Sequence, residues 1–82
     1  METISDALLR AAIARCKSEI ADANATINLY LNSPVGVGEH PDIVTEILSA
    51  CEKGAGARER LEFLEETIPR ASAINSDFGL RE

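Results

Sequence analysis

Aromatic residues, cysteines and positive charge are all scarce in this chain, and each shortage excludes a class of protein. Aromatic side chains make up 4% of the 82 residues and are limited to Tyr30, Phe63 and Phe78. With alanine supplying much of the apolar content, this composition argues against a β-sandwich and favours closely packed helices. Two cysteines, Cys16 and Cys51, are too few for a disulfide scaffold. We expect both to be reduced, buried and inert.

The charge balance is acidic, with a formal net charge of −6. A chain of this kind lacks the basic patch that binds nucleic acid or anionic lipid. No stretch approaches the roughly 18 apolar residues of a membrane-spanning helix, and residues 1–10 lack the basic start and apolar run of a signal peptide. We therefore expect a cytoplasmic protein that contacts neither nucleic acid nor a membrane directly.

The length of the chain limits it to a single domain. Chains of this size bury a modest fraction of their surface and usually need a cross-link, a metal or a partner. The sequence shows no metal-ligand cluster and no cofactor motif, so we predict neither. Oligomerisation, as a dimer or a larger assembly, is the remaining route to stability.

Residues 3–31 are predicted to form a long first helix. Thr3 suits the N-cap, and Asp6 three residues later makes an acidic variant of the capping box. The apolar positions that follow alternate steps of four and three residues, which is the heptad spacing of a helix seam. They are Leu9, Ile13, Cys16, Ile20, Ala23, Ile27 and Tyr30.

Residues 41–68 are predicted to form a second helix, with Pro41 in its first turn and Pro69 just beyond its end. Its seam has the same spacing: Ile43, Ile47, Ala50, Gly54, Ala57, Leu61, Leu64 and Ile68. Gly54 and Gly56 are a weak point at which this helix could kink or break. Laid antiparallel, the two seams match, with Ile20 opposite Gly54. The predicted fold is therefore all-α: residues 1–82 form one helical-hairpin domain that oligomerises into a helical bundle.

Two features suggest where copies of the chain meet. A row of small residues follows the first helix at heptad spacing, and a short tail of residues 69–82 carries three bulky apolar side chains. We expect the tail to dock on the hairpin or on a neighbouring subunit. The predicted oligomer interface comprises Ala7, Ala11, Ala14, Ala21, Ala25, Ile74, Phe78 and Leu80.

The connection between the helices is richer than a helical turn requires. Its Gly-x-Gly pattern before a helix start could offer backbone N–H groups to an anion, although Glu39 and Asp42 would repel a phosphate. His40 has too few neighbouring ligands for a zinc site. The simpler interpretation is that the glycines permit tight backbone geometry and that Val35 and Val37 close the end of the hairpin. We also expect this loop to be an interaction site. Its candidate residues are Asn32, Pro34, Gly36, Gly38, Glu39, His40 and Asp42.

The segment 32–43, which reads NSPVGVGEHPDI, resembles a segment of small α-helical proteins of tailed bacteriophages, many of them marine. Those proteins are also similar in having a helix on each side of the loop. The resemblance covers about residues 19–68 in pattern and is specific only in the loop. It implies a phage-encoded protein that acts in the host cytoplasm or in a particle, and it supplies no activity that could be carried over to this chain.

The sequence therefore predicts a non-enzymatic, oligomeric interaction protein that binds a host or phage protein. No pairing of nucleophile and base and no metal cluster supports catalysis. One alternative is a small-ligand binder, a sponge for nucleotide signals that counters host immunity. Its phosphate contacts would come from Arg10, Arg15, Lys17 and Arg58. Another alternative is a minor structural component of the virion.

Overall fold

Three helices make up the described part of the molecule. The computed structural model describes residues 2–32 and 42–79, the last two by their backbone alone. The helices are α1 (Ile4–Asn32), α2 (Ile43–Thr67) and α3 (Arg70–Gly79). The described residues contain no strand, which confirms the predicted all-α class. Among these helices, none has the length and apolar character needed to cross a membrane.

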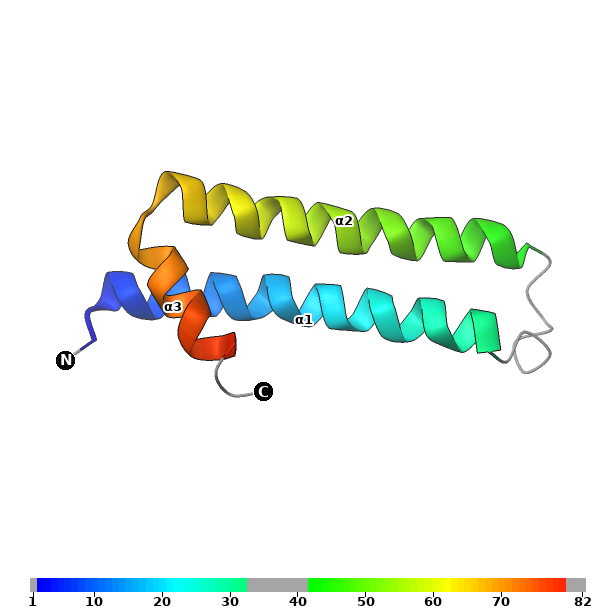
Figure 1. The fold of residues 1–82 in the computed structure, drawn as a ribbon, viewed down its shortest axis with the longest axis horizontal. Helices are drawn as coiled ribbons and strands as arrows, with labels where there is room; N and C mark the ends of the chain where they lie inside the picture. The colour runs from blue at the N-terminus through cyan, green and yellow to red at the C-terminus, as the bar shows by residue number, and fades with distance from the viewer. Residues whose placement is uncertain (1, 33–41, 80–82) are drawn as a thin grey trace.

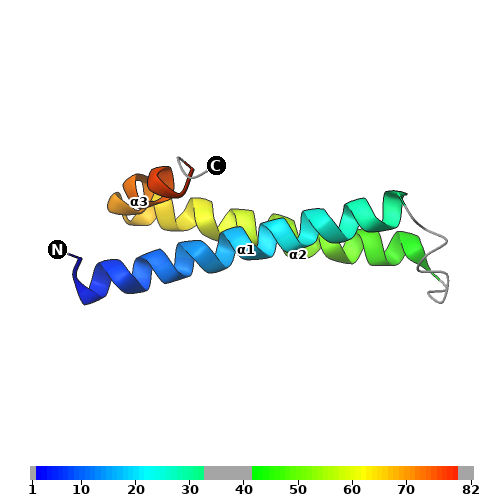
Figure 2. The same ribbon diagram turned by 90° about the horizontal axis from the view of Figure 1, so that it is seen from below.

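The two long helices lie side by side and run in opposite directions (Figure 1, Figure 2). Every seam position predicted on either helix is buried or half-buried, so the phase of both seams is confirmed. Ile13 and Ala57 are completely buried between them. The spacing of four and three residues turns one apolar stripe of each helix toward the other, and burial of those stripes stabilises the contact.

The register of the two seams differs from the expected one at Gly54. A Cβ atom built on Gly54 would lie 2.9 Å from the Cβ of Ala23, with no atom of Ile20 within 4 Å. The prediction that Gly54 faces Ile20 is therefore wrong. Two small residues meet here, and the helix backbones approach each other closely. Heptad spacing fixes which stripe faces the partner, but it does not fix the axial offset between the stripes.

The ends of the helices follow local capping chemistry. The Thr3 hydroxyl accepts a 3.0 Å hydrogen bond from the Asp6 backbone N–H at the start of α1. At the end of α2, Ile68 adopts extended backbone angles, as expected for the residue before a proline. α2 is continuous through Gly54 and Gly56, so the helix does not break at these two residues.

Asp42, which the predicted bounds 41–68 placed inside the second helix, is instead the N-cap of α2. Its carboxylate accepts hydrogen bonds from the Thr45 backbone N–H at 3.0 Å and from the Thr45 hydroxyl at 2.6 Å. Aspartate is among the best N-cap residues because it satisfies an N–H group that the helix leaves unpaired. The hydroxyl and the N–H of Thr45 lower the pKa of Asp42 below its ordinary value of 3.8.

Replacing Asp42 with alanine is expected to lower the melting temperature at pH 7, and this difference should shrink below pH 4. A carboxyl group with a lowered folded-state pKa stabilises the fold above its unfolded pKa, and the contribution disappears as the pH falls through the folded value. Thermal unfolding of both chains by circular dichroism at pH 7 and pH 2.5 measures the effect. A pH-independent difference would contradict the ionised cap.

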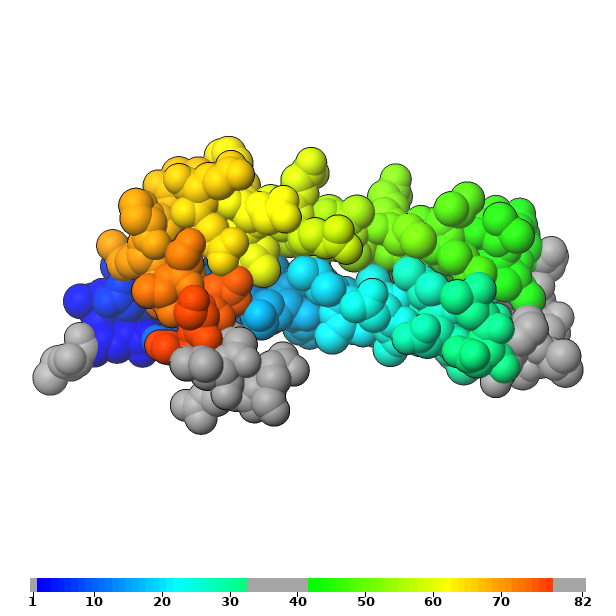
Figure 3. Space-filling view, in the orientation of Figure 1, coloured from blue at the N-terminus to red at the C-terminus, as the bar shows by residue number. Residues whose placement is uncertain are grey.

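The third helix packs against one end of the α1–α2 pair. Ala71 and Ile74 enter a core cluster with Leu9, Ile13 and Leu61. Figure 3 shows α3 across that end, with the two long helices extending beyond it. The tail therefore docks on its own chain. The prediction that Ile74 belongs to an oligomer interface is wrong, because its side chain fills the intramolecular core.

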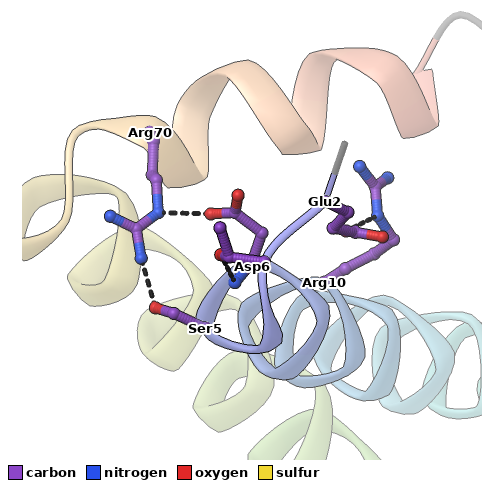
Figure 4. A network of polar contacts seen from close by, with 6 residues as sticks. Glu2, Ser5, Asp6, Arg10 and Arg70 are labelled. Carbon is purple, nitrogen blue, oxygen red and sulfur yellow. Dashed lines mark hydrogen bonds and ion pairs between the residues drawn. The ribbon is translucent and has the colours of Figure 1, made fainter.

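Polar contacts fix α3 to both long helices. Asn75 accepts a 3.0 Å hydrogen bond from Lys17 Nζ of α1 and donates one of 2.7 Å to Glu65 of α2. Arg70 pairs with Asp6 at 2.7 Å and donates a hydrogen bond to Ser5 (Figure 4). The Thr3 hydroxyl, the Thr3 backbone and Arg70 lower the pKa of Asp6. Asn75 and Arg70 together orient α3.

Candidate interaction groove

Among the described residues, seven large apolar side chains are more than half exposed, and they mark where the surface departs from that of a solitary small protein. Contiguous apolar patches on such proteins often mark sites of association, whereas single exposed apolar residues are ordinary. Three of the seven, Ile4, Leu8 and Phe63, lie at the end of the molecule that carries α3. The complete set is Ile4, Leu8, Leu29, Leu31, Val44, Leu48 and Phe63.

The three residues at the α3 end border a groove between α1 and α2. Its deeper part has a volume of about 1080 Å³. A second, shallower hollow adjoins it, sharing Ala12 and reaching Ile68, and we treat the two as parts of one groove. The deeper part is lined by Ala11, Ala12, Arg15, Cys16, Glu59, Arg60, Phe63 and Leu64, and Ile4 and Leu8 line the shallower one.

The groove lies on the side of the long helices opposite to α3. On α1, Lys17 contacts α3 and Arg15 lines the groove. On α2, Glu65 contacts α3 and Phe63 lines the groove. Residues two positions apart on an α-helix point in nearly opposite directions, because each residue turns the helix by about 100°. Figure 2 shows α3 on one side of the pair, so this apolar end is covered on one side and open on the other.

Opposite charges face each other across the open side. Arg15 of α1 and Glu59 of α2 line the same part of the groove, and neither has an ion-pair partner among the described residues. Further along, Asp22 of α1 and Lys53 of α2 line a more polar part and are likewise unpaired within the described chain. Arg60, in contrast, pairs with Glu19 across the groove.

The predicted interaction loop lies almost entirely outside the described residues. Pro34, Gly36, Gly38, Glu39 and His40 fall there, so their proposed role stays a prediction. Of the two members that are described, Asn32 ends α1 and donates a 2.8 Å hydrogen bond to the Asn28 carbonyl. The other, Asp42, caps α2.

The four cations predicted to meet a phosphate do not converge. Arg10 pairs with Glu2 at 2.8 Å (Figure 4), and Lys17 binds Asn75 beside α3. Arg15 lines the groove, whereas Arg58 borders a separate hollow formed by α2 alone. Phosphate binding needs several donors on one centre, and this arrangement does not provide them within one chain.

The alanine row of α1 is exposed along its whole length. Its members are Ala7, Ala11, Ala14, Ala21 and Ala25, and only Ala11 reaches the groove. Their assignment to an oligomer interface stays a prediction, as does that of Phe78 and Leu80, whose side chains lie outside the described residues. Cys16 is buried as predicted, but Cys51 is exposed, because it lies one position beyond the buried Ala50 and turns away from α1.

The sequence reasoning missed the groove residues Ile4, Leu8 and Phe63. A signal was present, since Ile4, Leu8, Ala11 and Arg15 follow one another at steps of four and three.

Among residues 2–32 and 42–79, no group of three His, Cys, Asp or Glu side chains is placed to hold a metal ion. Comparison with protein-family models, curated proteins and solved structures gives no match to this chain. The apolar groove between α1 and α2 is therefore the feature of the described chain that indicates a function.

Proposed function

We propose that this chain is a non-enzymatic protein-interaction module. In this proposal the antiparallel helical hairpin, held by α3 on one side, binds a helix of another polypeptide on its open side. The observation that carries the proposal is the exposure of Leu8 and Phe63, each 67% exposed, beside one apolar groove. Taking up an amphipathic helix is a common use of such a groove.

The size of the chain supports the same conclusion. Four of the ten buried apolar residues in the described part of the chain are alanines, which contribute little buried area each. A helix in the groove would remove Ile4, Leu8 and Phe63 from water, and fully burying one such side chain contributes about 1.5–3 kcal/mol. The module therefore works within an oligomer or a complex. The resemblance of residues 32–43 to phage proteins supports a phage-encoded module that acts in the host cytoplasm.

A labelled peptide tests the groove. The probe is a fluorescein-labelled amphipathic helix with leucine at heptad spacing, and fluorescence anisotropy follows its binding to the full chain. Replacing Leu8 with glutamate should weaken binding at least tenfold, since a tenfold change corresponds to about 1.4 kcal/mol. That is less than the contribution of one buried leucine.

Leu48→Glu is the matched control, because Leu48 is 62% exposed and lies outside the groove lining. Both variants place the same charge on an exposed leucine of a long helix. The control should bind the peptide like the natural chain. Equal losses in the two variants would show that the groove is not the interaction surface.

A further inference from the structure

We infer that the groove is occupied by a second copy of this chain, related to the first by a two-fold axis parallel to the long helices. This inference rests on the proposed function, and it names the partner and the arrangement. With that axis, α1 of each copy lies over α2 of the other at the same level, and the two hairpins form an antiparallel four-helix bundle. Shape and charge in the groove both support it.

The shape is self-complementary across the groove. Phe63 protrudes from α2, while Ala11 and Ala12 line the same part of the groove from α1. Their small side chains leave a hollow opposite the ring. Because the two-fold axis places α2 of one copy over α1 of the other, the partner's Phe63 enters that hollow. The same contact forms twice, and the pairing of a large side chain with small ones is typical of well-packed helices.

The charges are self-complementary in the same arrangement. Arg15 on α1 faces the partner's Glu59. Both residues line the groove and have no ion-pair partner among the described residues of their own chain. The pair forms twice, so the interface gains two opposite-charge contacts.

The other two-fold arrangement of the same faces is unfavourable. An axis lying in the interface but perpendicular to the helices would place α1 over α1 of the partner. Near that axis Arg15 would then approach the partner's Arg15, and Glu59 of α2 would approach the partner's Glu59. Contact between like charges selects against an interface. The distribution of charge therefore favours the parallel axis.

Charge reversal with the full chain tests the inference. Arg15→Glu and Glu59→Arg should each raise the dissociation constant of the self-assembly at least tenfold, measured by sedimentation equilibrium. An equimolar mixture of the two variants should recover dimers that contain one copy of each, detected by native mass spectrometry. In that mixed dimer both pairs are again of opposite charge. Arg58→Glu and Glu62→Arg make the same charge changes outside the groove lining and should leave self-assembly unchanged.

Recovery of mixed dimers supports the two-fold arrangement, because a purely intrachain effect would not favour one combination of copies. Self-assembly that ignores the charge at residues 15 and 59 overturns the arrangement. A chain that stays monomeric at 100 µM, yet binds the labelled peptide through Leu8, overturns the second copy as partner and leaves the proposed function standing. If Leu8→Glu and Leu48→Glu behave alike in both assays, the inference and the proposed function both fall.

Discussion

A chain with alanine in place of Ile13 is expected to lose about 2–5 kcal/mol of unfolding free energy. Ile13 is the largest completely buried side chain among the described residues, and it packs where all three helices meet. Removing its outer carbons leaves a cavity that the surrounding side chains fill only in part. An 82-residue domain has about 4–12 kcal/mol of total stability, so this variant would approach the limit of folding.

Chemical denaturation at fixed protein concentration measures that loss. Ile13→Val keeps most of the volume and should cost about 0.5–1.5 kcal/mol. Val44→Ala is the surface control, because Val44 is 66% exposed and such changes usually stay within about 0.5 kcal/mol. Equal effects of Ile13→Ala and Val44→Ala would contradict the core that the three helices share.

Leucine in place of Gly54 is expected to destabilise the fold by about 1–3 kcal/mol, through overpacking. Even a single added carbon at this position would lie 2.9 Å from Ala23 Cβ, closer than two such atoms approach. Alanine at position 54 gains about 1 kcal/mol of helix propensity, but it must also push the two helices apart. We therefore expect Gly54→Ala to be no more stable than the natural chain.

Gly56 supplies the matched control two residues away on the same helix. A Cβ there would meet only the end of the Arg60 side chain, at 3.9 Å. Gly56→Ala should therefore gain the full helix propensity of about 1 kcal/mol. If the two alanine variants were stabilised equally in urea unfolding, Gly54 would not lie at the point of closest approach.

Sequence periodicity was sufficient for the two long helices and for their buried stripes. Each seam repeats over seven or eight positions, so a single unfavourable residue such as a glycine does not obscure the helical pattern. Pro69 defines the end of α2 within one residue. The helix α3 was missed because, among its residues 70–77, whose side chains are described, only Ala71 and Ile74 are buried. So short a helix depends on its tertiary contacts more than on its own propensity.

The groove could not be derived from the pattern of either helix alone. Whether Leu8 and Phe63 are buried depends on which side of the pair α3 covers. That side is selected by Asn75, which binds Lys17 and Glu65, and such a three-way polar contact leaves no periodic trace in the sequence. The predicted meeting of Arg10, Arg15, Lys17 and Arg58 at one phosphate does not occur for a similar reason. Rotation along a helix points residues that are close in sequence toward different sides.

Because the buried core residues are unevenly distributed, the free energy of local unfolding differs between the two ends of the molecule. The cluster beneath α3 joins three helices through Leu9, Ile13, Leu61 and Ile74. The opposite end is closed by the buried Ala23, Ala50 and Tyr30, whereas Ile27, Ile43 and Ile47 are only half-buried there. Regions with few buried apolar contacts open locally at low free energy while the rest stays folded. Local unfolding is therefore expected to begin where α1 ends and α2 starts. The end that carries the groove stays folded while the far end opens.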